Sequence, residues 1–97
     1  MWHEVVLAPE AVEDSRRLSA RDRSSVRDAL KCYLRQGPAR ESISSVKRLR
    51  GIPRPQYRLR VGDLGTFYDV GEGVVEILAI IRKSQAKAWL KDIGGEM

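Results

Sequence analysis

The chain has 97 residues, of which 42% are hydrophobic and 32% are charged, and its formal net charge at pH 7 is +5. This length fits a single domain over residues 1–97, and the balance of apolar and charged residues excludes a disordered chain. No apolar run can span a bilayer, and Met1–Glu4 lacks the features of a signal peptide. A single cysteine, Cys32, fits a reducing compartment. We therefore expect a cytoplasmic protein with no membrane partner, and the positive charge favours a polyanionic partner.

The first half of the sequence predicts a strand and two helices. Their expected ranges are Trp2–Leu7, Pro9–Leu18 and Ser19–Gln36. Proline suits the first turn of a helix, and Ser19 is a good N-cap with Asp22 placed to meet the helix dipole. Apolar residues of the second helix recur with helical spacing, at Val26, Ala29, Leu30, Tyr33 and Leu34. Gly37-Pro38 is expected to end this helix, and residues 39–45 to form a loop.

The second half predicts three strands and a short helix. The expected strands are Gln56–Val61, Leu64–Val70 and Val74–Ile81, and Ser84 is expected to cap the helix. Gly62-Asp63 reads as a two-residue hairpin turn, which makes the first two strands antiparallel. The predicted fold class is α+β: an N-terminal strand, a helical hairpin packed on a largely antiparallel sheet, and a short C-terminal helix.

Basic residues are concentrated between Lys47 and Arg60, a stretch with no acidic residue. Lys47, Arg48, Arg50 and Arg54 precede the strand, and we expect them to contact RNA. Within the strand, apolar residues alternate with Arg58 and Arg60, which is the pattern of one apolar and one cationic face.

Counting from the predicted turn places Arg60 opposite Gly65 and Arg58 opposite Phe67, on the face away from the core. We expect Phe67 to present a ring on which a base can stack, and Arg82 with Lys83 to close the same face. Alternating arginines can also simply solvate an exposed sheet face, and this reading stays open.

Other catalytic patterns are absent from the sequence. His3 is the only histidine, no His/Cys cluster suggests a metal site, and no glycine loop suggests a nucleotide cofactor. Asp69 is expected to pair with an arginine. Any catalysis is therefore expected to need neither metal nor cofactor.

Three segments resemble the RelE/ParE superfamily of bacterial toxins: Val46–Gly51, Tyr57–Asp63 and Phe67–Val70. The stretch from Val75 to Ile81 followed by a basic pair adds to the likeness, which favours the RelE branch. The resemblance implies a type II toxin that forms a hetero-oligomer with a cognate antitoxin. It also implies ribosome-dependent cleavage of mRNA, without metal, by attack of the 2′-hydroxyl on the adjacent phosphate. By this likeness the catalytic positions are Arg58, Arg60 and Lys83, with Arg82.

The chain departs from the family pattern at two positions. Gly65 stands where the family usually has an arginine, and the usual tyrosine of the last helix is replaced by Lys87 or Trp89. Trp89 can either stack on an RNA base or dock the last helix on the sheet. These departures keep an alternative open: a non-catalytic binder, either a ParE-like inhibitor of DNA gyrase or a degenerate toxin that binds only antitoxin or RNA.

Overall fold

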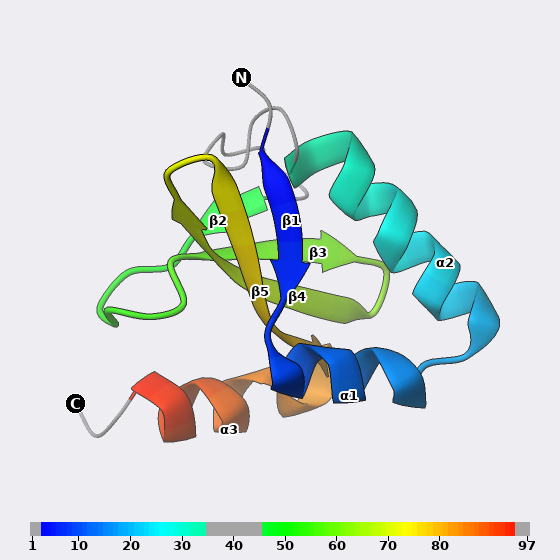
Figure 1. The fold of residues 1–97 in the computed structure, drawn as a ribbon. Coiled ribbons are helices and arrows are strands. Elements are labelled where there is room, and N and C mark those ends of the chain that lie inside the picture. The colour runs from blue at the N-terminus through cyan, green and yellow to red at the C-terminus, as the bar shows by residue number, and fades with distance from the viewer. Residues whose placement is uncertain (1–2, 35–45, 95–97) are drawn as a thin grey trace.

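The computed structural model describes residues 3–34 and 46–94, which form one α+β unit around a single sheet (Figure 1). The elements in chain order are β1 (Glu4–Leu7), α1 (Pro9–Arg17), α2 (Ala20–Ala29), the π-helical turn η1 (Leu30–Leu34), β2 (Val46–Arg48), β3 (Tyr57–Val61), β4 (Leu64–Gly71), β5 (Val74–Arg82) and α3 (Lys83–Gly94). The predicted fold class is confirmed. No described helix is long and apolar enough to cross a membrane.

The sheet has the strand order β1-β5-β4-β3-β2. β1 runs parallel to β5, and every other neighbouring pair is antiparallel. Helices α1 and α2 contribute Ala11 and Val26 to the core on one face, where they meet Leu59, Tyr68 and Ile77. Helix α3 packs on β4 and β5 at the end of the sheet where β5 leads into it (Figure 1).

The helix starts follow local chemistry. The hydroxyl Oγ of Ser19 accepts a hydrogen bond from the Asp22 backbone N–H at 3.1 Å, so the predicted cap of α2 is confirmed. Helix α3 begins at Lys83, one residue before the predicted cap, because β5 continues into it without an intervening loop. The predicted end of the second helix at Gln36, the Gly37-Pro38 stop and the loop at 39–45 lie outside the described residues.

Strand β2 was not predicted from the sequence. It is only three residues long, and the glycine and prolines that follow it suggest a loop. Its pairing with β3 places Val46 beside Leu59 in the core and Lys47 beside Arg58 on the opposite face. The basic stretch therefore belongs to two strands rather than one.

The β3–β4 hairpin has the predicted register. Val61 pairs with Leu64 across the Gly62-Asp63 turn, and Arg60 pairs with Gly65. Gly62 has φ +59°, a left-handed conformation that glycine adopts without steric cost. Parity along this hairpin is what sends Arg58 and Arg60 to the face away from the core.

A candidate cationic cleft between the hairpin and helix α3

A cleft of about 240 Å³ lies between the β3–β4 hairpin and helix α3. Arg58 and Arg60 reach it from β3, and Lys83 and Lys87 reach it from α3; Asp63 is the acidic residue in its lining. Leu64, Ala86 and Leu90 supply apolar surface. The structure thus brings together three of the four predicted catalytic residues and adds Lys87, which the sequence analysis left as one of two options. We call this site the cationic cleft.

The two lysines share one side of α3 because they are four residues apart, which is one helical turn. The arginines are two residues apart on β3, so they share one face of the sheet. Among the described residues, none of these four side chains has an acidic partner within 4.0 Å. Four cations converging from two rigid elements, with one carboxylate nearby, make a site for an anionic group.

Arg58 is only half-buried as a residue, but its Nε atom is buried and has no hydrogen-bond partner. Arg60, two residues further along the strand on the same face, is exposed. A buried N–H without an acceptor costs free energy, which an incoming anion would recover.

Arg82 does not close the cationic cleft, and this expectation is wrong. Arg82 pairs with Leu64, so its side chain lies on the core-facing side of the sheet. Its guanidinium is 3.7 Å from Asp22 of α2 and 3.9 Å from Asp63. A bulge in the β4–β5 pairing beside Phe67 and Tyr68 causes the change. One extra residue in β5 reverses the side on which each later residue points.

Phe67 is fully buried, so the prediction that its ring is open for a base is wrong. The ring packs against Trp89 of α3 with their centroids 5.0 Å apart, and Trp89 Nε1 donates a 2.8 Å hydrogen bond to Glu10 Oε2. Of the two roles considered for Trp89, docking of the last helix is the one observed. Helix α3 is thereby fixed to both the sheet and α1.

Comparison with known proteins supports the fold through solved structures and gives no match by sequence. Neither a protein-family model nor a curated protein matches the chain. Among solved structures, the free toxin RelE of E. coli, in a variant with two arginines replaced by alanine, matches with a TM-score of 0.73 and 19% identity over 96% of each chain. A chain of the RelBE2 toxin–antitoxin complex of Mycobacterium tuberculosis matches with a TM-score of 0.71 and 20% identity, over 86% of this chain and 100% of that one. The archaeal RelE–RelB complex of Pyrococcus horikoshii gives a TM-score of 0.65 and 23% identity, over 88% and 99%.

The chain has a RelE-like fold. The resemblance drawn from the sequence is thus confirmed for the architecture, from the first strand to the last helix. The cationic cleft lies on this RelE-like scaffold between its hairpin and its C-terminal helix.

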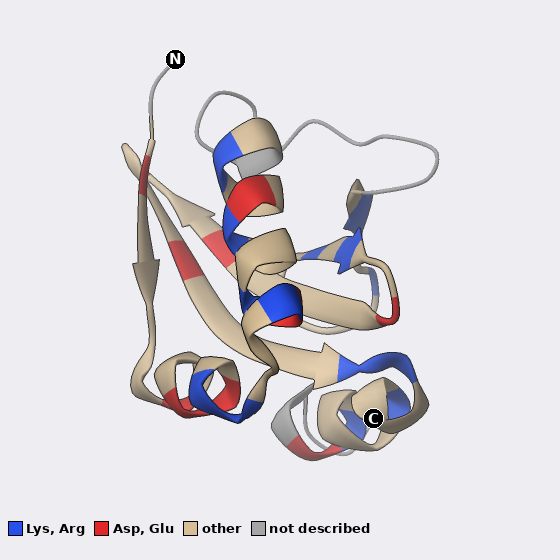
Figure 2. Cartoon of the chain, turned by 90° about the vertical axis from the view of Figure 1, so that its right-hand side faces the viewer, with Lys and Arg blue, Asp and Glu red and all other residues tan. Residues whose placement is uncertain are grey.

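The remaining basic residues of the RelE-like chain diverge in direction. Lys47 shares the face of Arg58, its partner across β2 and β3. Arg48 lies on the opposite face, where its Nη1 donates a 3.1 Å hydrogen bond to the Tyr57 hydroxyl. Figure 2 shows the basic residues along β2 and β3 and where β5 meets α3. Arg50 is exposed after β2. Lys47 and Arg50 thus remain predicted RNA contacts.

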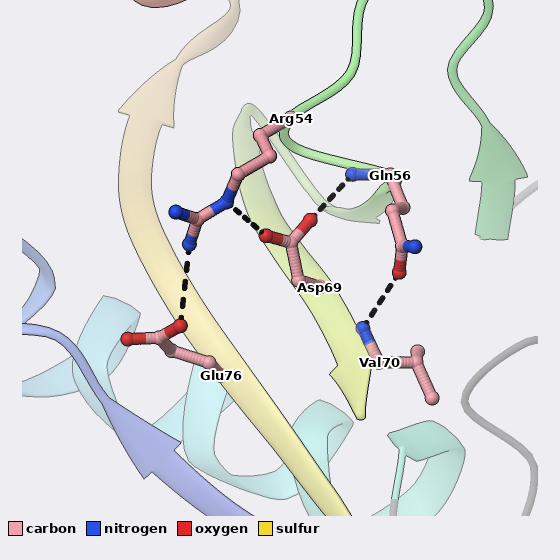
Figure 3. Close-up of polar contacts among 5 residues, drawn as sticks. All are labelled: Arg54, Gln56, Asp69, Val70 and Glu76. Atoms are coloured by element: carbon pink, nitrogen blue, oxygen red, sulfur yellow. Dashed lines mark hydrogen bonds and ion pairs between the residues drawn. The ribbon is translucent and has the colours of Figure 1, made fainter. Parts of the chain in front are cut away.

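Arg54 is held in an acidic network away from the cleft (Figure 3). Its Nε donates a 2.6 Å hydrogen bond to Asp69 Oδ2, and its Nη2 a 3.3 Å bond to Glu76 Oε1. The other Asp69 oxygen accepts from the Gln56 backbone N–H at 2.8 Å, and Gln56 Oε1 accepts from the Val70 N–H. The expected pairing of Asp69 with an arginine is confirmed. Arg54 anchors the segment before β3 while its side chain stays 60% exposed, so its contact with RNA remains a prediction.

No group of three or more His, Cys, Asp or Glu side chains within residues 3–34 and 46–94 is placed to hold a metal ion. His3 precedes β1, and Cys32 is exposed within η1.

Proposed function

We propose that this chain is the toxin of a toxin–antitoxin pair and that it cleaves mRNA on the ribosome. The observation that carries the proposal is the cationic cleft, in which Arg58, Arg60, Lys83 and Lys87 converge on one volume of about 240 Å³. The RelE-like fold supports it, since the matched solved structures are toxins or toxin–antitoxin complexes.

The chemistry follows from the charge that builds during phosphodiester cleavage. When the RNA 2′-hydroxyl attacks the adjacent phosphate, negative charge grows on the non-bridging oxygens, and the 5′-oxygen leaves. Arg58 and Arg60, fixed on a strand, are placed to stabilise those oxygens, and fixed donors of this kind contribute about 10²–10³-fold each. The ammonium of Lys83 or Lys87, on the opposite wall, can donate the proton that the leaving oxygen needs.

The described lining of the cleft contains no histidine to take the proton from the 2′-hydroxyl, so in our proposal that proton passes to solvent water as the 2′-oxygen bonds to phosphorus. This weak activation of the nucleophile is the reason for involving the ribosome. A site that mainly supplies positive charge gains most from a substrate already bent into the geometry for in-line attack. Holding mRNA in such a geometry is the role we assign to the ribosome.

An antitoxin partner is proposed on separate grounds. Two of the matched solved structures are toxin–antitoxin complexes, from M. tuberculosis and P. horikoshii. A chain with a net charge of +5 and an open cationic cleft favours a partner segment rich in acidic residues. Co-purification with the product of an adjacent small reading frame tests this, and a chain that purifies alone from the co-expressing host contradicts it.

Induced expression in a bacterial host with 5′-end mapping of cellular mRNA tests the activity. We expect new ends inside translated codons, lost when translation initiation is blocked. Ends that persist without translation would contradict ribosome dependence. Growth arrest with intact mRNA would contradict cleavage altogether and favour the non-catalytic binder, such as a gyrase inhibitor. One observation favours that alternative. The indole of Trp89 contacts Glu10 and Phe67 and is therefore not available to stack on an RNA base.

A further inference from the structure

We propose that the cationic cleft holds a whole nucleotide: its cations bind a phosphate, and Leu90 and Ala86 of α3 contact the attached base. This rests on the proposed function for RNA as the natural ligand, but free nucleotides test it without any cleavage of mRNA.

The side of α3 that lines the cleft combines charge with apolar surface. Lys83, Ala86, Lys87 and Leu90 follow the spacing i, i+3, i+4 and i+7, which places them on one helix face, and all four line the cleft. A small inorganic anion needs only the lysines. An apolar surface beside them suits a ligand that joins an anionic group to a flat, largely apolar ring, as a nucleotide does.

Leu90 is the apolar side chain of the described lining with the most surface left to cover. Leu64 and Ala86 are at most 9% exposed, whereas Leu90 is only half-buried. Leu90 is also not among the partly buried apolar residues that pack against the core cluster of the described residues. The neighbouring rings are not open to a base, because Phe67 is fully buried and Trp89 packs against it.

The spacing on α3 fits one nucleotide. Lys87 and Leu90 are three residues apart, and Cβ atoms at this separation on a helix lie about 5–6 Å from each other. A phosphate at Lys87 and a base at Leu90 can therefore belong to the same nucleotide, with Arg58 and Arg60 reaching the phosphate from β3. The cleft volume of about 240 Å³ corresponds to about eight water molecules at roughly 30 Å³ each, which leaves room beside a phosphate group.

The first experiment titrates the protein with adenosine 5′-monophosphate, cytidine 5′-monophosphate and ribose 5-phosphate and obtains each Kd from ¹⁵N–¹H NMR shifts. Ribose 5-phosphate carries the same sugar and phosphate without a base. We expect the adenosine nucleotide to bind about fivefold more tightly than ribose 5-phosphate, with the cytidine nucleotide between them, because a purine buries more apolar surface. Equal binding of the adenosine nucleotide and ribose 5-phosphate, or no binding of the nucleotide, would overturn the proposal.

Two variants separate the base contact from the phosphate contact. Leu90→Asn is expected to lower the affinity for the adenosine nucleotide to that for ribose 5-phosphate, whereas Lys87→Ala should weaken both ligands by the same factor. Leu7→Asn is the matched control, since Leu7 of β1 is 36% exposed and does not line the cleft, and it should bind both ligands as the wild type does. Equal losses in Leu90→Asn and Leu7→Asn would contradict a base contact at Leu90.

A measurement on the wild type decides the proposal even if Leu90→Asn does not fold. In the complex with adenosine 5′-monophosphate we expect nuclear Overhauser effects between the adenine ring protons and the Leu90 methyl groups, and their absence at saturation would overturn the base contact.

The nucleotide site and the proposed activity can fail separately. If the wild type shows the contact with Leu90 but cleaves no mRNA on ribosomes, the proposed function fails and the nucleotide site stands. If the wild type cleaves mRNA, Leu90→Asn should cleave about fivefold more slowly at subsaturating ribosome concentration. An unchanged rate in that variant would contradict a base contact between Leu90 and mRNA.

Discussion

The sheet face that carries α3 contains two groups of arginines that differ in their neighbours. At one end, Arg58 and Arg60 face the lysines of α3, with no acidic partner among the described residues. At the other end, Arg54 is bonded to Asp69 and Glu76, which are direct cross-strand partners on β4 and β5. All three arginines come from one basic stretch of sequence.

This difference shows that charge density along a sequence does not identify an anion site by itself. An arginine paired with two carboxylates stabilises local structure and offers little potential to a phosphate, whereas like charges gathered without counter-ions attract one. Acidic residues on β1, β4 and β5 give the Arg54 end of the face a more negative potential than the end that carries the cleft (Figure 2).

The largest effect is expected from removing positive charge from the cleft. The double variant Arg60→Ala and Lys83→Ala removes one cation from each wall, and we expect at least about a 10²-fold loss of mRNA cleavage. Both side chains are exposed, so the thermal midpoint should change little. Single-turnover cleavage on ribosomes and a thermal melt measure the two quantities.

The matched control for that variant is Arg82→Ala, next to Lys83 in sequence but directed towards Asp22 and Asp63. It removes the same type of charge from the other side of the sheet. We expect cleavage close to the wild-type rate. A loss comparable to that of the double variant would show that Arg82 belongs to the cleavage site and that the cleft extends beyond the residues assigned to it.

Arg58 and Arg82 show why one part of the site was predictable and another was not. The faces of Arg58 and Arg60 depend on a two-residue turn that is visible in the sequence, and parity from that turn gave the observed register. The face of Arg82 depends on a bulge beside Phe67 and Tyr68, for which the apolar β5 sequence carries no local signal.

The contacts of α3 could not be predicted from local sequence patterns for a different reason. The hydrogen bond from Trp89 to Glu10 joins residues 79 positions apart, and the sequence left both stacking on RNA and packing on the sheet open for this indole. The burial of Phe67 and the entry of Lys83 and Lys87 into the cleft both follow from where α3 docks. The three strands from Tyr57 onwards were predictable because turn glycines separate them, and because the first alternates apolar with basic residues and the last is a continuous apolar run.

The second largest effect is expected from the paired region, and it concerns stability. Asp69→Ala leaves the Gln56 N–H without its acceptor and leaves Arg54 bonded to Glu76 alone, so we expect the free energy of unfolding to fall by about 1–3 kcal/mol. Asp69→Asn keeps an oxygen that can accept from Gln56 and should cost less. Urea unfolding of the three proteins measures this order.

Asp69→Asn also tests, through RNA binding, the comparison between the paired and unpaired arginines of this face. Asp69→Asn removes one of the two carboxylates bonded to Arg54 and leaves Glu76, so the positive potential of this face rises and binding of a short RNA oligonucleotide should strengthen. Weaker binding would mean that Arg54 already contacts RNA in its paired position.

A smaller effect is expected at the edge of the sheet. Lys47 lies beside Arg58 on the cleft-side face, and Lys47→Ala should weaken RNA binding severalfold. If Lys47 contacts one phosphate, the slope of log K against log salt should decrease in magnitude by about 0.7, the value for single strands. Lys31→Ala, an exposed lysine of η1, is the charge-matched control. An equal change in both variants would indicate a general effect of net charge.

The smallest effect comes from a carboxylate that, unlike Asp69, has no arginine of the described segments bonded to it. Asp14 Oδ2 accepts a 3.0 Å hydrogen bond from the Ile80 N–H of β5. Burial raises the pKa of Asp14 above its ordinary value of 3.8, the bond from Ile80 opposes the rise, and the nearby Glu10 adds to it.

Because the folded state holds this proton more tightly than the unfolded chain, the contribution of Asp14 to stability is fully present below about pH 4. It is lost as the pH rises through the raised folded-state pKa. Asp14→Asn keeps an acceptor for Ile80 and cannot ionise, so its unfolding free energy should exceed that of the wild type more at pH 7 than at pH 3.5. Urea unfolding across this range checks the sign. A difference that is constant with pH would mean that Asp14 has the same pKa in the folded and unfolded states. The hydrogen bond from the Ile80 N–H would then fully offset the effect of burial on that pKa.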